Sequence, residues 1–339
     1  MTKNKIYLYL SIFLAVVVLS LGSYFVVHRY YSGVIWKKAQ AAPELPKYFS
    51  VLDGLPVSSS EMVDPSVVVV MIDNHPDARP QHGLAAAKIM YEAPAEGGIT
   101  RYVAVFDSSQ DVAKVGPVRS ARPYFIEWLK EYSGLYIHCG GSPEGLQKII
   151  TDKIFDLDEM KNGPYFWRGD EHDAPHNLYT SSENWNKVLD KKADKKKIFS
   201  NGWKFGDLNV STTEIVNNLA VNFTSDYVVD FNYDPNLKIY TRSINNKQIL
   251  EDGQPLVGQT IVVQYVKVQI VDDYGRKEIN TDGSGDLRVL RDGVMIHGQW
   301  KKEGNRTRWY DQNGTEINLK PGKTWVEVVP NDINIKIST

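Results

Sequence analysis

Residues 67–142 read VVVVMIDNHPDARPQHGLAAAKIMYEAPAEGGITRYVAVFDSSQDVAKVGPVRSARPYFIEWLKEYSGLYIHCGGS. The β-branched run at 67–72 predicts a strand that is buried on both faces, within a sheet covered by helices. The other elements predicted here and just beyond are strands at 101–106 and 134–138, and helices at 83–91, from Pro123 onward and at 142–150. Strands and helices alternate, which is typical of an α/β domain or an α+β domain.

The C-terminal third has a different pattern. Residues 230–339 contain short alternating runs, separated by pairs such as Asp292-Gly293 and Asn313-Gly314. Such pairs favour type I′ hairpin turns, because both central residues of that turn need a positive φ. We therefore predict an α/β domain at 66–205, a connection at 206–229 and a mostly β domain at 230–339. The length of 339 residues agrees, because one hydrophobic core rarely serves so long a chain.

An uncharged apolar run occupies residues 6–27, IYLYLSIFLAVVVLSLGSYFVV. Its 22 residues suffice for a helix to cross a hydrocarbon core about 30 Å thick. The alternative is a cleaved signal peptide, whose apolar core is only about 7–15 residues long. We therefore predict a single-pass signal anchor in the cell membrane, with cytoplasmic residues 1–5, a tether at 28–65 and an extracytoplasmic main part.

The overall charge and the cysteine count exclude several kinds of site. The formal net charge is −2, so no global field attracts nucleic acid, and any anion binding must come from a local cluster. Cys139 is the one cysteine, which excludes an intramolecular disulfide and a cysteine-rich zinc site. Adjacent strand residues point to opposite faces, so Cys139 is poorly placed to act with His138, and we predict an inert thiol.

The motif GPVRSARP at 116–123 is the sharpest local signal. If Pro123 begins a helix, Arg119 and Arg122 lie at its positive end, where cations are slightly unfavourable. An anion held between them would explain this placement, because helix N-termini and arginine forks bind phosphate and carboxylate. The alternative is that both arginines form structural ion pairs. The acids available for such pairs are Asp73, Glu92 and Glu96.

Acidic residues follow the first predicted strand and flank the second. Asp73-Asn74-His75 comes directly after 67–72, which in a parallel sheet is the carboxyl end, where clefts form. Glu92 and Glu96 can share this edge. Two carboxylates in one cleft can serve as acid and base in glycoside cleavage. As capping or ion-pairing residues they need no catalysis, so both interpretations stay open.

The irregular, aromatic stretch at 156–182 is too polar for a core and too aromatic for a linker. His172 and His176, with a third ligand such as His138, would make a zinc site. The proline between the two histidines disfavours the helical spacing that such a pair needs. We therefore predict an ordered loop, tied down by His176 and Asn177, and no metal or cofactor.

Several of these motifs occur together, in the same order, in one known family. The sequence resembles the YerB-like family of bacterial envelope lipoproteins in IDNHPDARPQHGL, YEAPAEGGITRY, GPVRSARPYF, HCGGS, APHNLYTS and GKTWVEVVP. The resemblance covers roughly residues 67–330 and implies an α/β first part and a β-rich second part at the outer face of the cytoplasmic membrane. It implies no established activity. Family members often carry a lipobox cysteine, which is missing near the apolar run here, so a transmembrane helix is expected to replace the lipid.

We predict that the α/β domain binds an anionic or carbohydrate ligand of the cell wall. The alternatives are a wall glycan hydrolase with paired carboxylates and a non-catalytic scaffold for wall enzymes or other envelope proteins. The candidate catalytic residues are Asp73, Glu92, Glu96 and His138. The candidate ligand-binding residues are Asn74, Arg101, Arg119, Arg122, Arg168, His176 and Asn177.

Overall fold

The computed structural model describes residues 3–35, 46–191 and 202–339. The chain separates into two compact units, Met1–Lys47 and Tyr48–Thr339. Part of the predicted tether, 36–45, and most of the charge run at 190–197 lie outside the described residues.

The N-terminal unit contains helix α1 (Lys3–Ile35). Its section Lys3–Arg29 has a mean hydropathy of 2.4, and none of its apolar window is buried. At 1.5 Å per residue these 27 residues extend about 40 Å, which exceeds a hydrocarbon core of about 30 Å. The predicted run 6–27 therefore lies inside a helix that is long and apolar enough to cross a membrane.

The globular unit is built around one large mixed sheet, to which both halves of the chain contribute strands. Across its ten described strands the order is β22 (Arg306–Asp311), β21 (Val294–Glu303), β20 (Ser284–Arg291), β17 (Thr260–Val266), β23 (Thr324–Pro330), β4 (Ile89–Pro94), β5 (Thr100–Asp107), β3 (Val67–Asp73), β6 (Leu135–His138) and β7 (Asp156–Asp158). The pairs β17–β23, β23–β4, β3–β6 and β6–β7 are parallel, and the other neighbours are antiparallel. Because β23 pairs with β4, the predicted segments 66–205 and 230–339 share one sheet without a break.

A second sheet shares a hydrophobic core with one face of the first. Its strands are β13 (Lys247–Gln248), β12 (Ile239–Ile244), β11 (Tyr227–Asp234), β10 (Asn218–Thr224) and β24 (Asn334–Ser338), with β16 (Val257–Gly258) also on β12. Val70 and Ile72 of β3 lie in the same core as Leu219, Phe231 and Tyr240 of this sheet. The remaining strands form the pairs β1–β2 (Tyr48–Phe49, Pro56–Val57), β8–β9 (Trp167–Arg168, Leu178–Tyr179), β14–β15 (Leu250–Glu251, Gln254–Pro255) and β18–β19 (Val268–Ile270, Lys277–Ile279).

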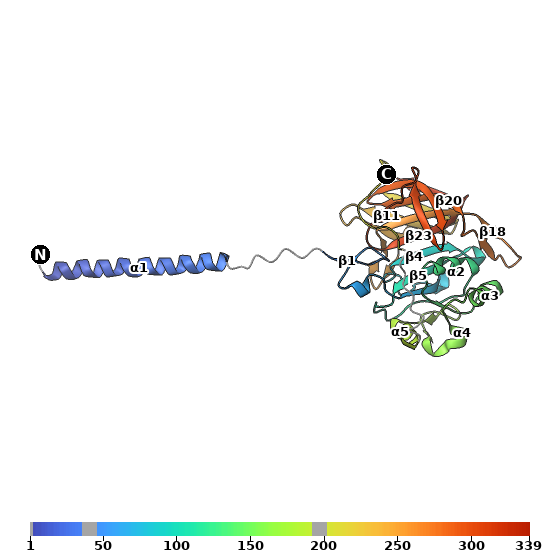
Figure 1. The fold of residues 1–339 in the computed structure, drawn as a ribbon, viewed down its shortest axis with the longest axis horizontal. Helices are drawn as coiled ribbons and strands as arrows, with labels where there is room; N and C mark the ends of the chain where they lie inside the picture. The colour runs from blue at the N-terminus through green and yellow to red at the C-terminus, as the bar shows by residue number, and fades with distance from the viewer. Residues whose placement is uncertain (1–2, 36–45, 192–201) are drawn as a thin grey trace. The chain divides into compact units, whose positions relative to one another are not determined.

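Helices belong mainly to the first half of the globular unit. They are α2 (Pro123–Lys130), α3 (Pro143–Thr151), α4 (Glu159–Asn162) and α5 (Ser182–Lys191), with short 3-10 turns at Ser60–Met62, Pro76–Ala78, Glu96–Gly98 and Gly163–Tyr165. Helix α2 begins at Pro123, whose fixed φ suits the first helical position. Its Phe125 and Trp128 share a core with Val69 and Met71, on the other face of β3. In Figure 1, β11 and β20 lie at one end of the globular unit and α4 and α5 at the other, with β4, β5 and β23 between.

The prediction of a doubly buried strand at 67–72 is confirmed, because every residue of β3 is buried. The prediction of a helix at 83–91 is wrong, because the chain enters β4 at Ile89. β4 lies between β5 and β23, and these long-range partners outweigh the helix propensity of the alanines that precede it. The parallel arrangement expected around β3 holds on its β6 side only, since β5 runs antiparallel.

Of the two predicted hairpin turns, the first is confirmed. Asp292 and Gly293 have φ values of 52° and 77°, and they join β20 to β21. At the second turn only Gly314 has a positive φ, of 82°. There the Asp311 carboxylate accepts a hydrogen bond from the N–H of Asn313 at 3.0 Å, so side-chain capping replaces the predicted type I′ geometry.

Candidate functional site

Asp73 is the centre of a polar cluster at the end of β3. Its Oδ1 accepts a hydrogen bond from the N–H of His75 at 3.0 Å, while Oδ2 lies 2.8 Å from both Arg119 Nε and His176 Nδ1. Burial acts to raise the pKa of Asp73, but Arg119, the His75 N–H and His176 outweigh it and hold that pKa below its usual range. Asp73 is therefore an ionised, fully buried carboxylate that holds Arg119 and His176 in place. We call Asp73, His75, Arg119 and His176 the Asp73 cluster.

Arg119 belongs to an extended segment that crosses the ends of β3 and β6. Its N–H donates to Met71 O at 2.9 Å, and the N–H of Cys139 donates to Arg119 O at 3.1 Å. Only about a fifth of the Arg119 side chain is exposed, at 22 %. Among the described residues Asp73 is the only acid paired with it, and its terminal nitrogens donate no hydrogen bond. The terminal nitrogens of Arg119 are thus left available for an anion.

Arg122 is held differently, so the predicted anion fork between Arg119 and Arg122 does not form. Glu96 accepts hydrogen bonds from Arg122 through both of its oxygens, one of them at 3.0 Å from Nη2. Arg101 lies 3.7 Å from the same carboxylate. Burial acts to raise the pKa of Glu96, but Arg122 and then Arg101 lower it. Arg122 and Glu96 therefore make the structural ion pair that the sequence left open as the alternative.

Glu92 lies inside the protein rather than on a cleft. Its Oε2 is 2.5 Å from Arg242 Nη2, and neither side chain has any exposed surface. Asn74, predicted to bind ligand, donates to Glu92 Oε1 at 3.2 Å and is equally buried. Tyr227 of the second sheet also donates to Oε1, at 2.6 Å. Glu92 and Asn74 thus join the two sheets, and a substrate has no access to either side chain.

The in-register neighbour of Glu92 is another buried acid, Glu327 of β23. Burial, followed by the charge of Glu92, raises the pKa of Glu327 well above its ordinary value of 4.5. The folded state therefore keeps a proton that the unfolded chain loses, so Glu327 stabilises the folded state least at high pH.

Relative to wild type, Glu327→Gln is expected to become more stable as pH rises above about 5, by up to about 1.4 kcal/mol per pH unit. Urea unfolding of both proteins at intervals of ~1 pH unit between pH 5 and pH 8 measures the difference in their free energies of unfolding. A difference that does not change with pH would contradict the prediction.

His138 and Cys139 are placed as structural residues. His138 is buried, with Nδ1 2.8 Å from Gly140 O and Nε2 3.3 Å from Asp156 Oδ2. Cys139 donates through Sγ to Glu159 at 3.3 Å. Burial, followed by Glu159, raises the pKa of the thiol to about 11, which agrees with the predicted inert state. Neither residue is in a position to act as a nucleophile or base on a ligand.

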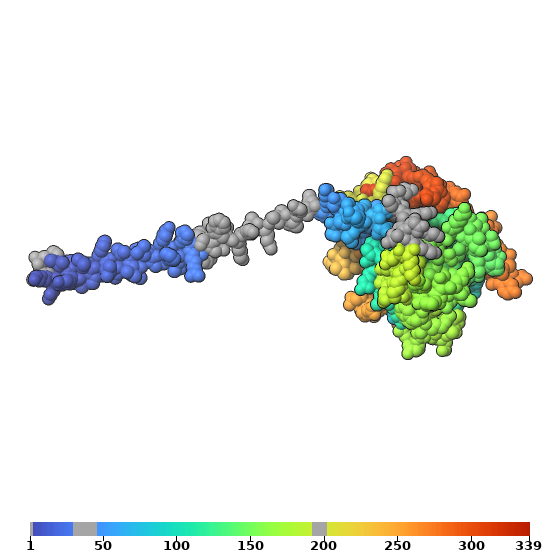
Figure 2. Space-filling view, turned by 60° about the horizontal axis from the view of Figure 1, so that its bottom comes forward, coloured from blue at the N-terminus to red at the C-terminus, as the bar shows by residue number. Residues whose placement is uncertain are grey.

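The loop between β8 and β9 contributes the remaining predicted residues. Arg168 is exposed, and its Nη1 donates to Asn177 Oδ1 at 2.8 Å, while Asn177 Nδ2 donates to Gly169 O at 3.0 Å. This ties the loop down as predicted. His172 Nε2 lies 3.1 Å from Pro80 O, and the histidine that lies against His176 is His75. Figure 2 shows that the green segments, which include α4 and α5, form a broad surface on this side of the globular unit.

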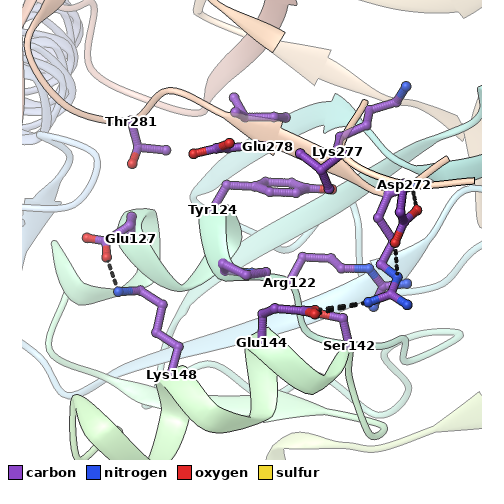
Figure 3. Close-up of a pocket in the computed structure, with 14 residues that line it drawn as sticks. Arg122, Tyr124, Glu127, Ser142, Glu144, Lys148, Asp272, Lys277, Glu278 and Thr281 are labelled. Atoms are coloured by element: carbon purple, nitrogen blue, oxygen red, sulfur yellow. Dashed lines mark hydrogen bonds and ion pairs between the residues drawn. The ribbon is translucent and has the colours of Figure 1, made fainter. Parts of the chain in front are cut away.

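A groove of about 590 Å³ opens beside the arginine segment, between α2, α3 and the hairpin β18–β19. Figure 3 shows Tyr124 lying between the hairpin and the helices, with Lys277 and Thr281 on one wall and Lys148 on the other. Arg276 crosses the groove and pairs with Glu144 at 3.1 Å and with Asp272 at 2.9 Å. Charges of both signs, an aromatic ring and apolar side chains therefore line this space.

The Asp73 cluster and this groove lie at the two ends of the same element. The segment from Arg119 to Arg122 runs beside the turn after β6, because the N–H of Ala121 donates to Gly140 O at 3.0 Å and that of Ser142 to Ala121 O at 3.2 Å. Arg122 and Ser142 line the groove. An extended chain spans at most about 3.6 Å per residue, so the Cα atom of Arg119 lies within about 11 Å of that of Arg122, which lines the groove.

Comparison with known proteins places the chain in a family. Residues 52–198 match the model of "Protein of unknown function (DUF3048) N-terminal domain", and residues 219–326 match that of the corresponding C-terminal domain. The chain belongs to the DUF3048 family. It is 33 % identical over 303 residues to "Putative lipoprotein YerB" of Bacillus subtilis, covering 87 % of this chain and 90 % of that protein. The predicted resemblance to the YerB-like family is thereby confirmed.

The fold of the DUF3048 family is also seen in a solved relative. The crystal structure of the YerB protein from Bacillus subtilis matches with a TM-score of 0.77 at 32 % identity, over 86 % of this chain and 100 % of that one. The solved chain of that relative is matched over its full length by the corresponding region of this chain. This supports the use of Tyr48–Thr339 as an independent unit in experiments.

Sequence reasoning about this DUF3048 protein missed two partners. Arg242, which neutralises Glu92, lies in a strand of the second sheet, and no local motif marks it. His75 stacks on His176, with ring centroids 4.6 Å apart. The sequence held one indication that His75 belongs to the site: it is part of the motif Asp73-Asn74-His75, which directly follows the predicted strand at 67–72.

Proposed function

We propose that this DUF3048 protein is held at the outer face of the cytoplasmic membrane by α1 and binds an anionic cell-wall glycan. The apolar helix and the relative that is named a lipoprotein both support a membrane-attached envelope protein. The site would be the Asp73 cluster together with the groove beside it. The single observation that carries the proposal is the state of Arg119: its Nε lies 2.8 Å from Asp73, and its terminal nitrogens donate no hydrogen bond within the described part of the chain.

The charge balance around Arg119 supports an anionic ligand. Arg168 is exposed and is held by a neutral amide, that of Asn177, rather than by an acid. A phosphate or carboxylate that receives hydrogen bonds from a guanidinium gains a charge-assisted interaction, about twice as strong as a neutral one. Asp73 keeps Arg119 in place before the ligand arrives, so less side-chain entropy is lost on binding.

The groove supports a polymer rather than a small ion. The Cα atom of its lining residue Arg122 lies within about 11 Å of that of Arg119, so a glycan whose anionic group reaches Arg119 has neighbouring units at the groove. Tyr124 and the hydroxyls of Ser142 and Thr281 are among its lining residues, and polar groups on an aromatic wall suit sugars. The paired-carboxylate alternative for hydrolysis loses its basis, because Glu92 is buried against Arg242.

Arg119→Ala is expected to weaken binding of Tyr48–Thr339 to peptidoglycan that carries its anionic polymers by about 10- to 100-fold. This corresponds to the loss of a charged hydrogen-bond donor, about 1.5–3 kcal/mol. Co-sedimentation with purified wall at several salt concentrations measures it, and the buffer contains EDTA so that metal ions play no part. Wild-type binding should weaken as salt rises, because the contact is electrostatic.

Arg288→Ala serves as the matched control. Arg288 is a partly exposed arginine of β20 that stacks on Tyr265, away from both the cluster and the groove. It should bind like wild type. Arg119→Lys keeps the charge but not the planar guanidinium, so its affinity for the wall should lie between those of wild type and Arg119→Ala. Equal binding by Arg119→Ala and wild type, with matching thermal unfolding, would remove the basis for the proposal. Wild-type protein that stays in solution would point to a protein partner.

A further inference from the structure

A second histidine and an exposed acid meet at the Asp73 cluster. One potential ligand atom from each of His75, Asp77 and His176 lies within 4.8 Å of the other two. The side chains are 37 %, 75 % and 15 % exposed, respectively, so a solvated ion reaches them from outside. Two imidazoles and a carboxylate are a donor set that suits divalent transition metals, and it is one of the ligand sets of zinc sites.

His176 is oriented as a metal-binding histidine is. Its Nδ1 lies 2.8 Å from the Asp73 carboxylate, which accepts hydrogen bonds, so this nitrogen carries the proton and donates it. In neutral imidazole the lone pair is then on Nε2, which receives no hydrogen bond from the described residues. A carboxylate that fixes the far nitrogen of a histidine is the usual support of a zinc ligand.

His75 and Asp77 each place an atom that can accept a hydrogen bond or bind a metal ion near the other. The N–H of Asp77 donates to His75 Nδ1 at 3.2 Å, so Nδ1 is unprotonated. Its single lone pair is the one that a metal ion uses, so metal binding replaces this hydrogen bond. The Asp77 Oδ2 lies 3.5 Å from the same Nδ1. In a tetrahedral zinc site with bonds of about 2.0–2.2 Å, neighbouring ligand atoms are about 3.3–3.6 Å apart. The pair therefore already has the spacing of two ligands on one ion.

We propose that His75 Nδ1, Asp77 Oδ2 and His176 Nε2 bind one Zn²⁺ ion. The two imidazole rings are stacked, with centroids 4.6 Å apart, and they rotate on binding so that both nitrogens point to the ion. Three protein ligands leave a fourth position open, as in zinc sites that bind a further group. Arg119 and His176 lie against the same oxygen of Asp73, each at 2.8 Å, so the arginine and the ion share one supporting carboxylate. The metal site stands on its own residues and does not depend on the proposed glycan.

The test is titration of untagged, metal-free Tyr48–Thr339 with Zn²⁺ in the absence of any polymer. Calorimetry gives the stoichiometry and the dissociation constant, and Co²⁺ in place of Zn²⁺ reports the ligand geometry by its visible absorption. We expect about one ion per chain, with a Kd below about 100 µM. His75→Ala and Asp77→Asn should each weaken Zn²⁺ binding at least about tenfold. Asp73 orients His176 and is not itself a ligand, and Asp73→Asn should weaken binding by about 10- to 100-fold.

His172→Ala is the matched control, because His172 is a half-buried histidine of the same loop as His176 and the cluster does not use it. Its Zn²⁺ affinity should equal that of wild type. Absence of binding by wild type, or equal binding by the His75→Ala and Asp77→Asn variants, would overturn the assignment. Far-ultraviolet circular dichroism checks that each variant is folded. Because glycan binding is measured in EDTA, a failure of the metal site and a failure of the glycan proposal give separate results.

Discussion

Replacing Arg242 with methionine is expected to lower the free energy of unfolding by about 3–5 kcal/mol. Arg242 is fully buried and faces Glu92 at 2.5 Å, with Glu327 beside Glu92 in register on β23. Methionine fills much of the same volume but leaves the Glu92 carboxylate without its cation. An uncompensated buried charge costs far more than the pair itself contributes, so the loss should be large even though the shape is nearly kept.

Urea unfolding of Tyr48–Thr339 at pH 7 measures this effect, and two further variants bound it. Arg276→Met breaks exposed pairs with Glu144 and Asp272 and should cost less than about 1 kcal/mol. Adding Glu92→Gln to Arg242→Met removes the orphaned charge and should recover part of the loss. A loss for Arg242→Met no greater than that for Arg276→Met would show that Glu92 is solvated or neutral in the folded protein.

The elements predicted correctly are those whose sequence pattern is local. β3 is a continuous β-branched run, and α2 starts at a proline and carries its apolar residues on one face. The alanines at 85–87 favour the helix predicted at 83–91, whereas the strand β4, which begins at Ile89, depends on pairing with β5 and with β23. β23 lies more than two hundred residues after β4 in the sequence, so no local pattern predicts that these two strands pair.

The candidate site was predictable in part for the same reason. Asp73 and Arg119 belong to motifs close together in the sequence, and they do meet, at 2.8 Å. The sequence could not decide whether an arginine faces a ligand or an internal acid, because that depends on which carboxylate the fold brings opposite it. Glu96 reaches Arg122 and closes that fork, whereas Arg119 shares its acid with His176 and keeps its terminal nitrogens open.

Glu131→Ala is the second variant for which we expect a large loss, of about 3–5 kcal/mol in the free energy of unfolding. Glu131 follows the last residue of α2, and its side chain is fully buried. It accepts hydrogen bonds from Lys302 Nζ at 2.5 Å, from the Thr307 N–H at 3.0 Å and from the Thr307 hydroxyl at 2.7 Å. Arg306, also buried, lies 3.7 Å away. One carboxylate therefore joins the helix after β5 to the hairpin β21–β22.

The same helix supplies the control for Glu131→Ala. Glu127 is partly exposed and pairs with Lys130 and Lys148 at the groove, so Glu127→Ala should cost less than about 1 kcal/mol. If the two variants lose the same small amount in urea unfolding, Lys302 and Arg306 must be reaching water in the folded state. If Glu131→Ala alone is strongly destabilised in a single transition, the α2 region and the C-terminal hairpin unfold together. The segments matched by the N-terminal and C-terminal DUF3048 models would then form one cooperative unit, as expected for a sheet that runs unbroken from β4 to β23.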